Sequence, residues 1–181
     1  MNLPAQIAQH FRAVHFGGNW TAVNLKDQLT GVSWQNAAMN LDSCHSIATL
    51  TYHVNYFVAA VLQVLRGEPL TAHDKFSFDC PPIRSEGEWN ALREKLFANA
   101  KDAAMLIEQL PESTLWETFV EEKYGTYYRN LHGTIEHSHY HLGQITLTKK
   151  RLDARTQPAD PQDQPEAAQA EPQNDVDHRD R

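Results

Sequence analysis

The chain has 181 residues, and its 16 basic and 23 acidic side chains give a formal net charge of −7 at pH 7. This length suffices for one domain with a sizeable core, and an acidic balance without a basic stripe argues against nucleic-acid binding. The N-terminus lacks a basic segment followed by an apolar run, and no apolar stretch approaches 18 residues. We therefore expect a cytoplasmic protein without a signal peptide or a membrane span. Its two cysteines, Cys44 and Cys80, show no pairing pattern and are read as reduced thiols.

The N-terminal segment predicts an amphipathic helix followed by a long connection. Apolar residues recur at spacings of three and four from Leu3 to Val14, and the Gly17-Gly18 pair ends the helix. Two interpretations of the following "NWT" stay open. Asn19 and Trp20 either line a ligand pocket, as a polar group and an apolar wall, or belong to a helix stop with a packed tryptophan. Further on, Ser33 is expected to cap a short helical turn.

Two long helices follow in the middle of the chain. From Ser46 to Arg66 the apolar residues occupy one wide face, and Gly67 ends the helix. After a loop, Ser85 and Glu88 form a capping-box pattern that opens a third helix. That helix runs to about Leu110, where Pro111 stops it.

A fourth helix is predicted from about Thr126 to Leu152. Its apolar line has helical spacing and consists of Tyr128, Leu131, Ile135, Leu142 and Ile145, with Ser138 in the same line. Four long amphipathic helices predict an all-α four-helix bundle over residues 1–153. Residues 154–181 contain four prolines, seven acids and three bases and almost no aliphatic residue, so we expect a disordered tail there.

The stretch "HSHYHLGQI", residues 137–145, concentrates three histidines on this helix. A helical period puts His137 and His141 on one face and turns His139 to the opposite flank. A histidine pair four residues apart can chelate one metal ion, and a third ligand must then come from another helix. His53, beside the apolar face of the second helix, is the best candidate, and His10 and His15 on the first helix are weaker ones.

These residues resemble the metal site of the DinB-like (YfiT-like) metalloenzyme superfamily. Members of that superfamily are similar to four-helix bundles in which one histidine of the second helix and an H-x-x-x-H pair of the fourth bind a divalent metal. The Gly-Gln that commonly follows the pair matches Gly143 and Gln144, whereas Leu142 stands where the family often has a basic residue. The resemblance covers residues 1 to about 152. It implies a homodimer and a small-molecule substrate.

Three neutral histidines leave a fourth metal position for water or substrate. The ion could activate water or hold a thiolate, and relatives in the superfamily resemble transferases that use low-molecular-weight thiols. We therefore expect a metal-dependent hydrolase or thiol S-transferase with metal on His53, His137 and His141. Zinc is the expected ion, although nickel, iron or copper would suit the ligands. Gln144 could orient a ligand or a water. The alternative is a non-catalytic bundle that binds a metal or small ligand and acts through a protein partner.

Overall fold

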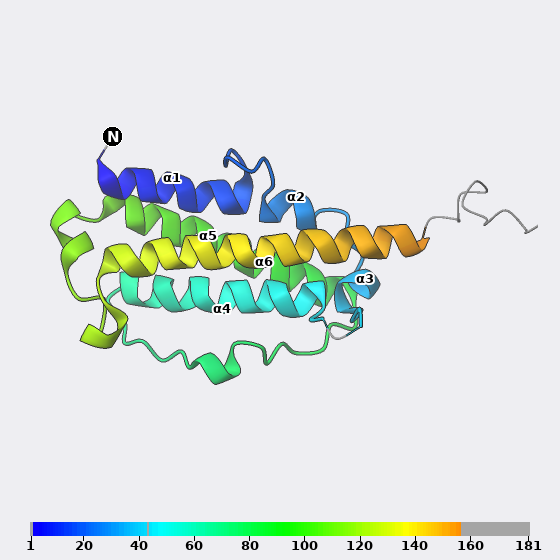
Figure 1. Cartoon of the computed structure of the whole chain (residues 1–181). Coiled ribbons are helices and arrows are strands. Elements are labelled where there is room, and N and C mark those ends of the chain that lie inside the picture. Colours follow the sequence, from blue (N-terminus) through cyan, green and yellow to red (C-terminus); the bar gives the residue numbers. More distant parts are fainter. Residues whose placement is uncertain (1, 43, 157–181) are drawn as a thin grey trace, which may run out of the picture.

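The computed structural model describes residues 2–42 and 44–156, which form a four-helix bundle (Figure 1). Its long helices are α1 (Leu3–Phe16), α4 (Ile47–Leu65), α5 (Glu86–Gln109) and α6 (Tyr127–Thr156). Two short helices, α2 (Leu25–Leu29) and α3 (Trp34–Ala38), lie in the connection between α1 and α4. The described residues contain no β-strand, and an isolated bridge joins Thr118 to Thr126. The expected all-α bundle is thus confirmed.

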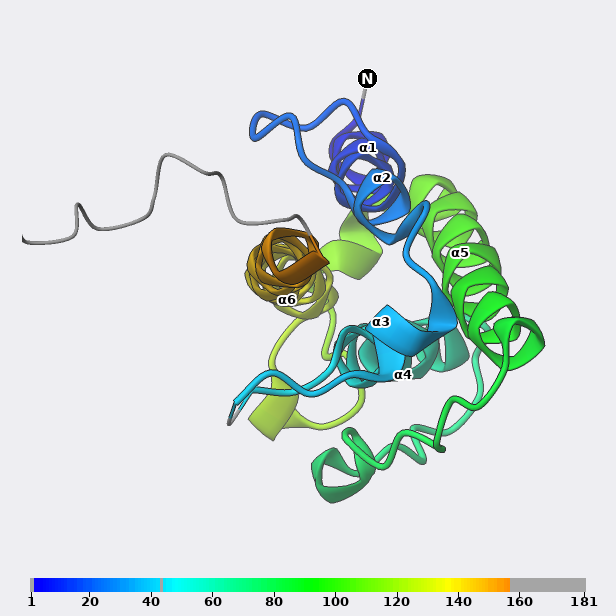
Figure 2. The ribbon, with the colours of Figure 1, turned by 90° about the vertical axis from the view of Figure 1, so that its right-hand side faces the viewer.

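The four long helices form a ring in which α1 packs on α5, α5 on α4, α4 on α6, and α6 on α1 (Figure 2). The helices α1 and α6 run in one direction, and α4 and α5 run in the other (Figure 1). This arrangement departs from a simple up-down-up-down bundle, because α4 and α5 are parallel neighbours joined by the long connection of residues 66–85. The ring places α4 directly beside α6, the two helices that carry the histidines of interest.

Most helix ends lie where the capping residues predict them. Ser46 accepts a hydrogen bond from the backbone nitrogen of Thr49 (3.1 Å) at the start of α4. Ser85 likewise accepts from the nitrogen of Glu88 (3.2 Å) at the start of α5. The reciprocal half of the predicted capping box differs, since the Glu88 carboxylate accepts from the nitrogen of Arg84 (2.6 Å). The expected boundary after residue 153 is three residues short of the end of α6, and residues 157–181 of the predicted tail lie outside the described residues.

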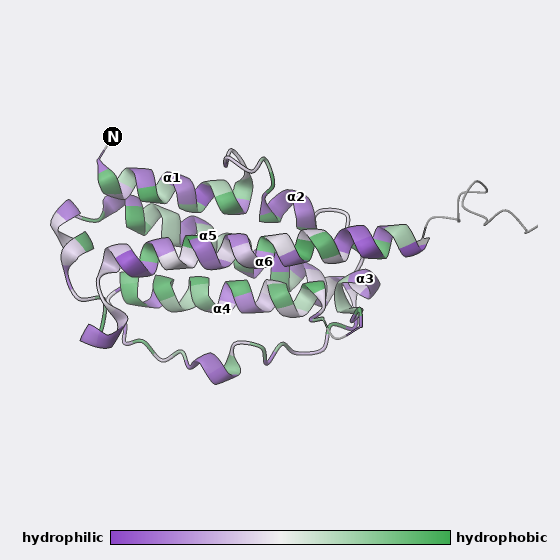
Figure 3. Ribbon diagram, in the orientation of Figure 1, coloured by the Kyte–Doolittle hydropathy of each residue, from purple (hydrophilic) through white to green (hydrophobic). Residues whose placement is uncertain are grey.

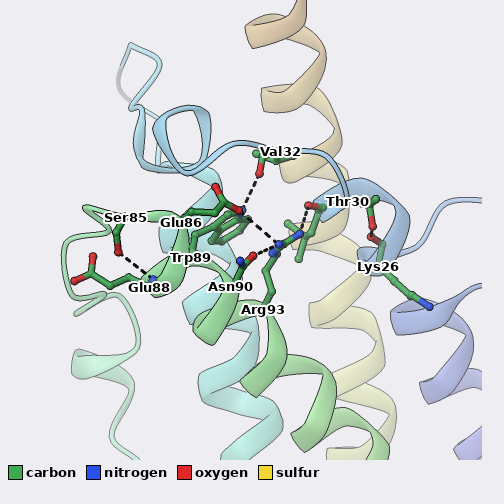
Figure 4. Close-up of polar contacts among 10 residues, drawn as sticks. Lys26, Thr30, Val32, Ser85, Glu86, Glu88, Trp89, Asn90 and Arg93 are labelled. Carbon is green, nitrogen blue, oxygen red and sulfur yellow. Dashed lines mark hydrogen bonds and ion pairs between the residues drawn. The ribbon is translucent and has the colours of Figure 1, made fainter.

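The first turns of α5 hold the α2–α3 connection in place (Figure 4). The fully buried Trp89 donates its indole N–H to the carbonyl oxygen of Val32 (2.9 Å). Arg93 donates to the carbonyl oxygen of Leu29 (3.1 Å) and to the side chain of Asn90. Ser33 caps α3 as predicted, because it accepts from the backbone nitrogen of Asn36 (3.3 Å). Neither short helix could be stable alone, so these contacts fix the path of the chain toward α4.

The connection of residues 66–85 runs back along α4 and is tied to it by side chains of that helix. The Tyr56 hydroxyl donates to the carbonyl oxygen of His73 (2.9 Å) and accepts from its backbone nitrogen (2.8 Å). Gln63 bonds Thr71 nearby (3.1 Å). A short 3-10 helix, Asp74–Phe76, follows and brings the buried Ser77 over α4. The connection therefore covers the middle of α4.

The core consists of the apolar stripes of the four long helices, with the greatest apolar content on α4 (Figure 3). Among the described residues, α4 is the one helix long and apolar enough, by length and composition, to cross a membrane. However, 61% of its apolar stretch is buried inside the bundle, as expected for a central core helix. Both cysteines are free, with Cys44 exposed and Cys80 partly buried.

Candidate metal centre

His53 on α4 and the His137–His141 pair on α6 converge on one point between the two helices. The Nε2 atom of His137 lies 3.0 Å from that of His53 and 3.0 Å from that of His141. Within the described residues, these three are the one group of side chains whose candidate ligand atoms cluster tightly enough for a metal, within 4.8 Å of one another. A tetrahedral ion bound at 2.0–2.1 Å would separate its nitrogens by about 3.3 Å, and the two 3.0 Å separations lie close to that value.

The outer ring nitrogens of two of these histidines have carbonyl partners. The Nδ1 of His53 lies 3.2 Å from the carbonyl oxygen of Ser77, and that of His141 lies 2.7 Å from the side-chain oxygen of Gln144. Each Nδ1 must carry the proton to donate, which leaves the Nε2 lone pair directed at the shared point. The Nδ1 of His137 is buried without a partner among the described residues. Two of the three rings are therefore held in the tautomer that binds metal.

Burial keeps these rings in their neutral form. Desolvation is the largest cause lowering the pKa of His53, of His141 and of His137, whose pKa falls to about 4. Repulsion from His141 lowers the pKa of His53 and His137 further, while the hydrogen bond to Gln144 opposes the shift at His141. Neutral imidazole is the metal-binding form, so the site needs no deprotonation at pH 7.

Aromatic rings surround the cluster. Phe78 stacks on His53 at a centroid distance of 3.8 Å, and Phe57 meets the edge of His137 at 4.7 Å. The exposed Tyr140 lies against His141 at 4.9 Å. An apolar surrounding strengthens electrostatic effects at the site, and three neutral ligands would leave the full charge of a divalent ion uncompensated. Such an ion would be a strong Lewis acid.

The other candidate histidines lie elsewhere. His139 faces the opposite flank of α6, as the helical period predicts, and lines a cavity with His10 of α1. Repulsion from His10 adds to burial in lowering the pKa of His139. Neither residue belongs to the metal-type cluster, so His10 does not supply a fourth ligand to it. Glu136, which neighbours a ligand in sequence, is exposed and is not part of the cluster either.

Asn19 and Trp20 line the same His10–His139 cavity, of about 480 Å³, rather than the surroundings of the three-histidine cluster. The Asn19 amide donates to the carbonyl oxygens of Ala13 and Val23 and so closes the loop after α1. Trp20 is fully exposed, at 101% of its reference area. The interpretation of a packed tryptophan is therefore wrong.

Three residues next to the metal centre were not predicted from the sequence. Ser77 and Phe78 belong to a loop without periodicity, so no sequence signal places them on His53. Phe57 does carry a signal, because it follows His53 by four residues and must share its side of α4. The apolar pattern of residues 46–66 by itself predicts only a core position for this ring.

No family model matches the chain, and no curated protein or solved structure matches it either.

Proposed function

We propose that this protein is a metal-dependent enzyme whose divalent ion is bound by His53, His137 and His141. The observation that carries the proposal is the convergence of three Nε2 atoms on one point, two of them from rings with a carbonyl partner at Nδ1. Because the Nδ1 atoms of His53 and His141 donate to carbonyl oxygens, both rings direct an Nε2 lone pair at the shared point, as metal-bound histidines do. The resemblance to the DinB-like superfamily agrees with this assignment.

Hydrolysis and thiol transfer are the reaction classes that such a ligand set supports. A bound divalent ion with an open position would lower the pKa of a coordinated water or thiol and polarise a substrate. The chain's own residues would fix the three rings, shield the site with Phe57 and Phe78, and hold His141 through Gln144. No carboxylate belongs to the ligand cluster, which favours a nucleophile activated by the ion over one activated by a side-chain base. Zinc is the ion we propose, with a low-molecular-weight thiol as a candidate co-substrate.

Metal binding is tested by zinc titration calorimetry and elemental analysis of the purified chain. We expect one equivalent of zinc in the parent, and loss of that equivalent in His53→Ala and in His141→Ala. His139→Ala is the matched control, since the residue lies on the same helix but outside the cluster, and it should retain the parent's metal content. Equal zinc content in the parent and in His141→Ala would contradict the proposal.

The fourth coordination position of the ion distinguishes an enzyme from the non-catalytic alternative. A Co²⁺-loaded protein whose visible absorption changes on addition of small thiols or azide has an exchangeable site, as an enzyme requires. A spectrum that no added ligand alters would favour a closed, structural site. A screen of ester, amide and thiol-transfer substrates then assigns the reaction class.

A further inference from the structure

A cavity of about 310 Å³ lies beside the metal centre, between α6 and the segment that leads into α4. Two of its lining residues connect it to the cluster. Gln144 bonds the outer nitrogen of His141, and His45 stacks on Phe78 (4.4 Å), whose ring in turn stacks on His53. The cavity therefore adjoins the residues that surround the three-histidine cluster.

The wall that α6 contributes continues the line of the metal ligands. His137, His141, Gln144, Thr148 and Arg151 follow one another at spacings of four and three residues, which keeps them on one face of the helix. From Gln144 to Arg151 the helix rises by about 10 Å. A molecule of modest length could thus reach from the centre to Arg151.

Two polar side chains of this wall lack partners within the described residues. Thr148 is only 6% exposed, yet its hydroxyl makes no hydrogen bond there. Other hydroxyl residues of α6 bond the carbonyl oxygen four residues earlier, as Thr134 does with Asn130 (2.8 Å) and Thr146 with Leu142 (2.8 Å). The Thr148 oxygen is not among the fully buried atoms without a partner; it keeps solvent contact in the wall of the cavity and is free to bond a ligand there.

Arg151 is the cation of this wall. It makes no ion pair or hydrogen bond with any described residue. Two neighbouring cations are occupied, because Lys149 donates to the carbonyl oxygens of Gln28 (2.9 Å) and Thr30 (3.2 Å), and Arg155 pairs with Asp42 (3.9 Å). Lys150 lines a different cavity. A guanidinium matches a carboxylate in shape and charge, and a single cation suits a single negative charge.

We infer that this cavity binds the carboxylate of a monoanionic substrate whose other end reaches the metal centre. Arg151 and Thr148 bond the carboxylate, while Leu41, Leu50 and Leu147 contact an apolar chain between the two ends. This inference rests on the proposed function for the metal end of the substrate. The carboxylate end depends on the cavity alone, and the two ends are therefore tested separately.

The carboxylate end is tested on metal-free protein by NMR titration with hexanoate, with 1-hexanol as the neutral control. Hexanoate should shift the Thr148 methyl and the Arg151 Nε–Hε signals, and hexanol should not. The shift of the Thr148 methyl should disappear in Arg151→Gln, and both shifts should persist in Lys150→Gln, which removes a charge one residue away on a different flank of α6. Absence of hexanoate shifts in the parent, or survival of the Thr148 shift in Arg151→Gln, would overturn the inference and leave the metal proposal untouched.

The complete arrangement is tested on Co²⁺-loaded protein through the visible absorption that thiolate binding produces. We expect 6-mercaptohexanoate to bind at least about tenfold more tightly than 6-mercaptohexan-1-ol, as one charge-assisted hydrogen bond predicts. Arg151→Gln should abolish this preference, Arg151→Lys should retain part of it, and Lys150→Gln should leave it unchanged. Equal affinities of the acid and the alcohol for the parent would refute the inference, whereas failure to bind cobalt would refute the proposed function instead.

Discussion

At the scale of single residues, the geometry of the metal centre depends on the hydrogen-bond partners of the outer ring nitrogens of its histidines. His141 and His53 are oriented by carbonyl oxygens of Gln144 and Ser77, one from the same helix and one from a loop. Such outer hydrogen bonds fix the ring and raise its basicity as a ligand. A mutation of either hydrogen-bond partner should therefore alter the metal centre while all three histidines stay in place.

Replacing Gln144 should weaken zinc binding while preserving the fold. In Gln144→Ala the His141 ring loses its acceptor at Nδ1, and we expect zinc affinity to fall by roughly 10- to 100-fold. Gln144→Glu, which supplies a stronger acceptor, should bind zinc at least as tightly as the parent. Competition with a chromophoric chelator measures both affinities. The control is Gln109→Ala, at the exposed end of α5, and equal affinities of Gln144→Ala and this control would contradict the expectation.

At the scale of elements, the helices were predictable and the long connection was not. The period of three to four along α6 alone separates His137 and His141 from His139, and the same logic puts His53 at the edge of the α4 stripe. By contrast, the path of residues 66–85 depends on contacts such as that of Tyr56 with His73, which no periodic pattern encodes. The position of Asn19 and Trp20 could not be predicted from the sequence either, because the side of the bundle on which they lie depends on the order of the helices in the ring.

Tyr56 should control the connection that orients His53. Tyr56→Phe removes both hydrogen bonds to the His73 backbone, each worth about 1 kcal/mol. We expect faster amide hydrogen exchange in residues 70–78 and a smaller loss of zinc affinity than in Gln144→Ala, since the Ser77 carbonyl would be held less firmly over His53. Hydrogen-exchange mass spectrometry with and without zinc measures this. Tyr124→Phe, outside the connection, should show neither effect; unchanged exchange in Tyr56→Phe would contradict the argument.

At the scale of the whole molecule, we propose that the bundle pairs into a homodimer without the C-terminal segment. Residues 157–181 have a proline-rich, acidic composition that contributes little to a core. Deleting them should leave the melting temperature, the zinc content and the dimeric state nearly unchanged. Light scattering coupled to size-exclusion chromatography gives the mass, and calorimetry gives the melting temperature. A truncated chain that becomes a monomer while the full chain is a dimer would contradict the prediction.

A second property of the whole molecule originates in a buried histidine outside the metal centre. His15 is fully buried on α1, stacks on Phe11 (4.6 Å) and has its Nδ1 2.7 Å from the Phe11 carbonyl oxygen. Its Nε2 is buried without a partner among the described residues. Burial lowers the pKa of His15 to about 4; the bond to Phe11 opposes this shift and the charge of His139 adds slightly to it. The folded chain therefore holds this ring neutral.

The low pKa of His15 predicts a loss of stability in acid. Between pH 6.5 and about 4 the unfolded chain takes up a proton on this ring that the folded chain does not, so the free energy of unfolding falls as the pH falls through this window. A shift of this size corresponds to roughly 3 kcal/mol. In His15→Gln, which cannot titrate, the difference in urea-unfolding free energy between pH 7.5 and pH 4 should shrink by a large part of that amount, measured with a chelator present so that metal release does not contribute. The exposed His73→Gln should keep the parent's pH dependence, and an equally steep dependence in His15→Gln would show that another group governs the acid transition.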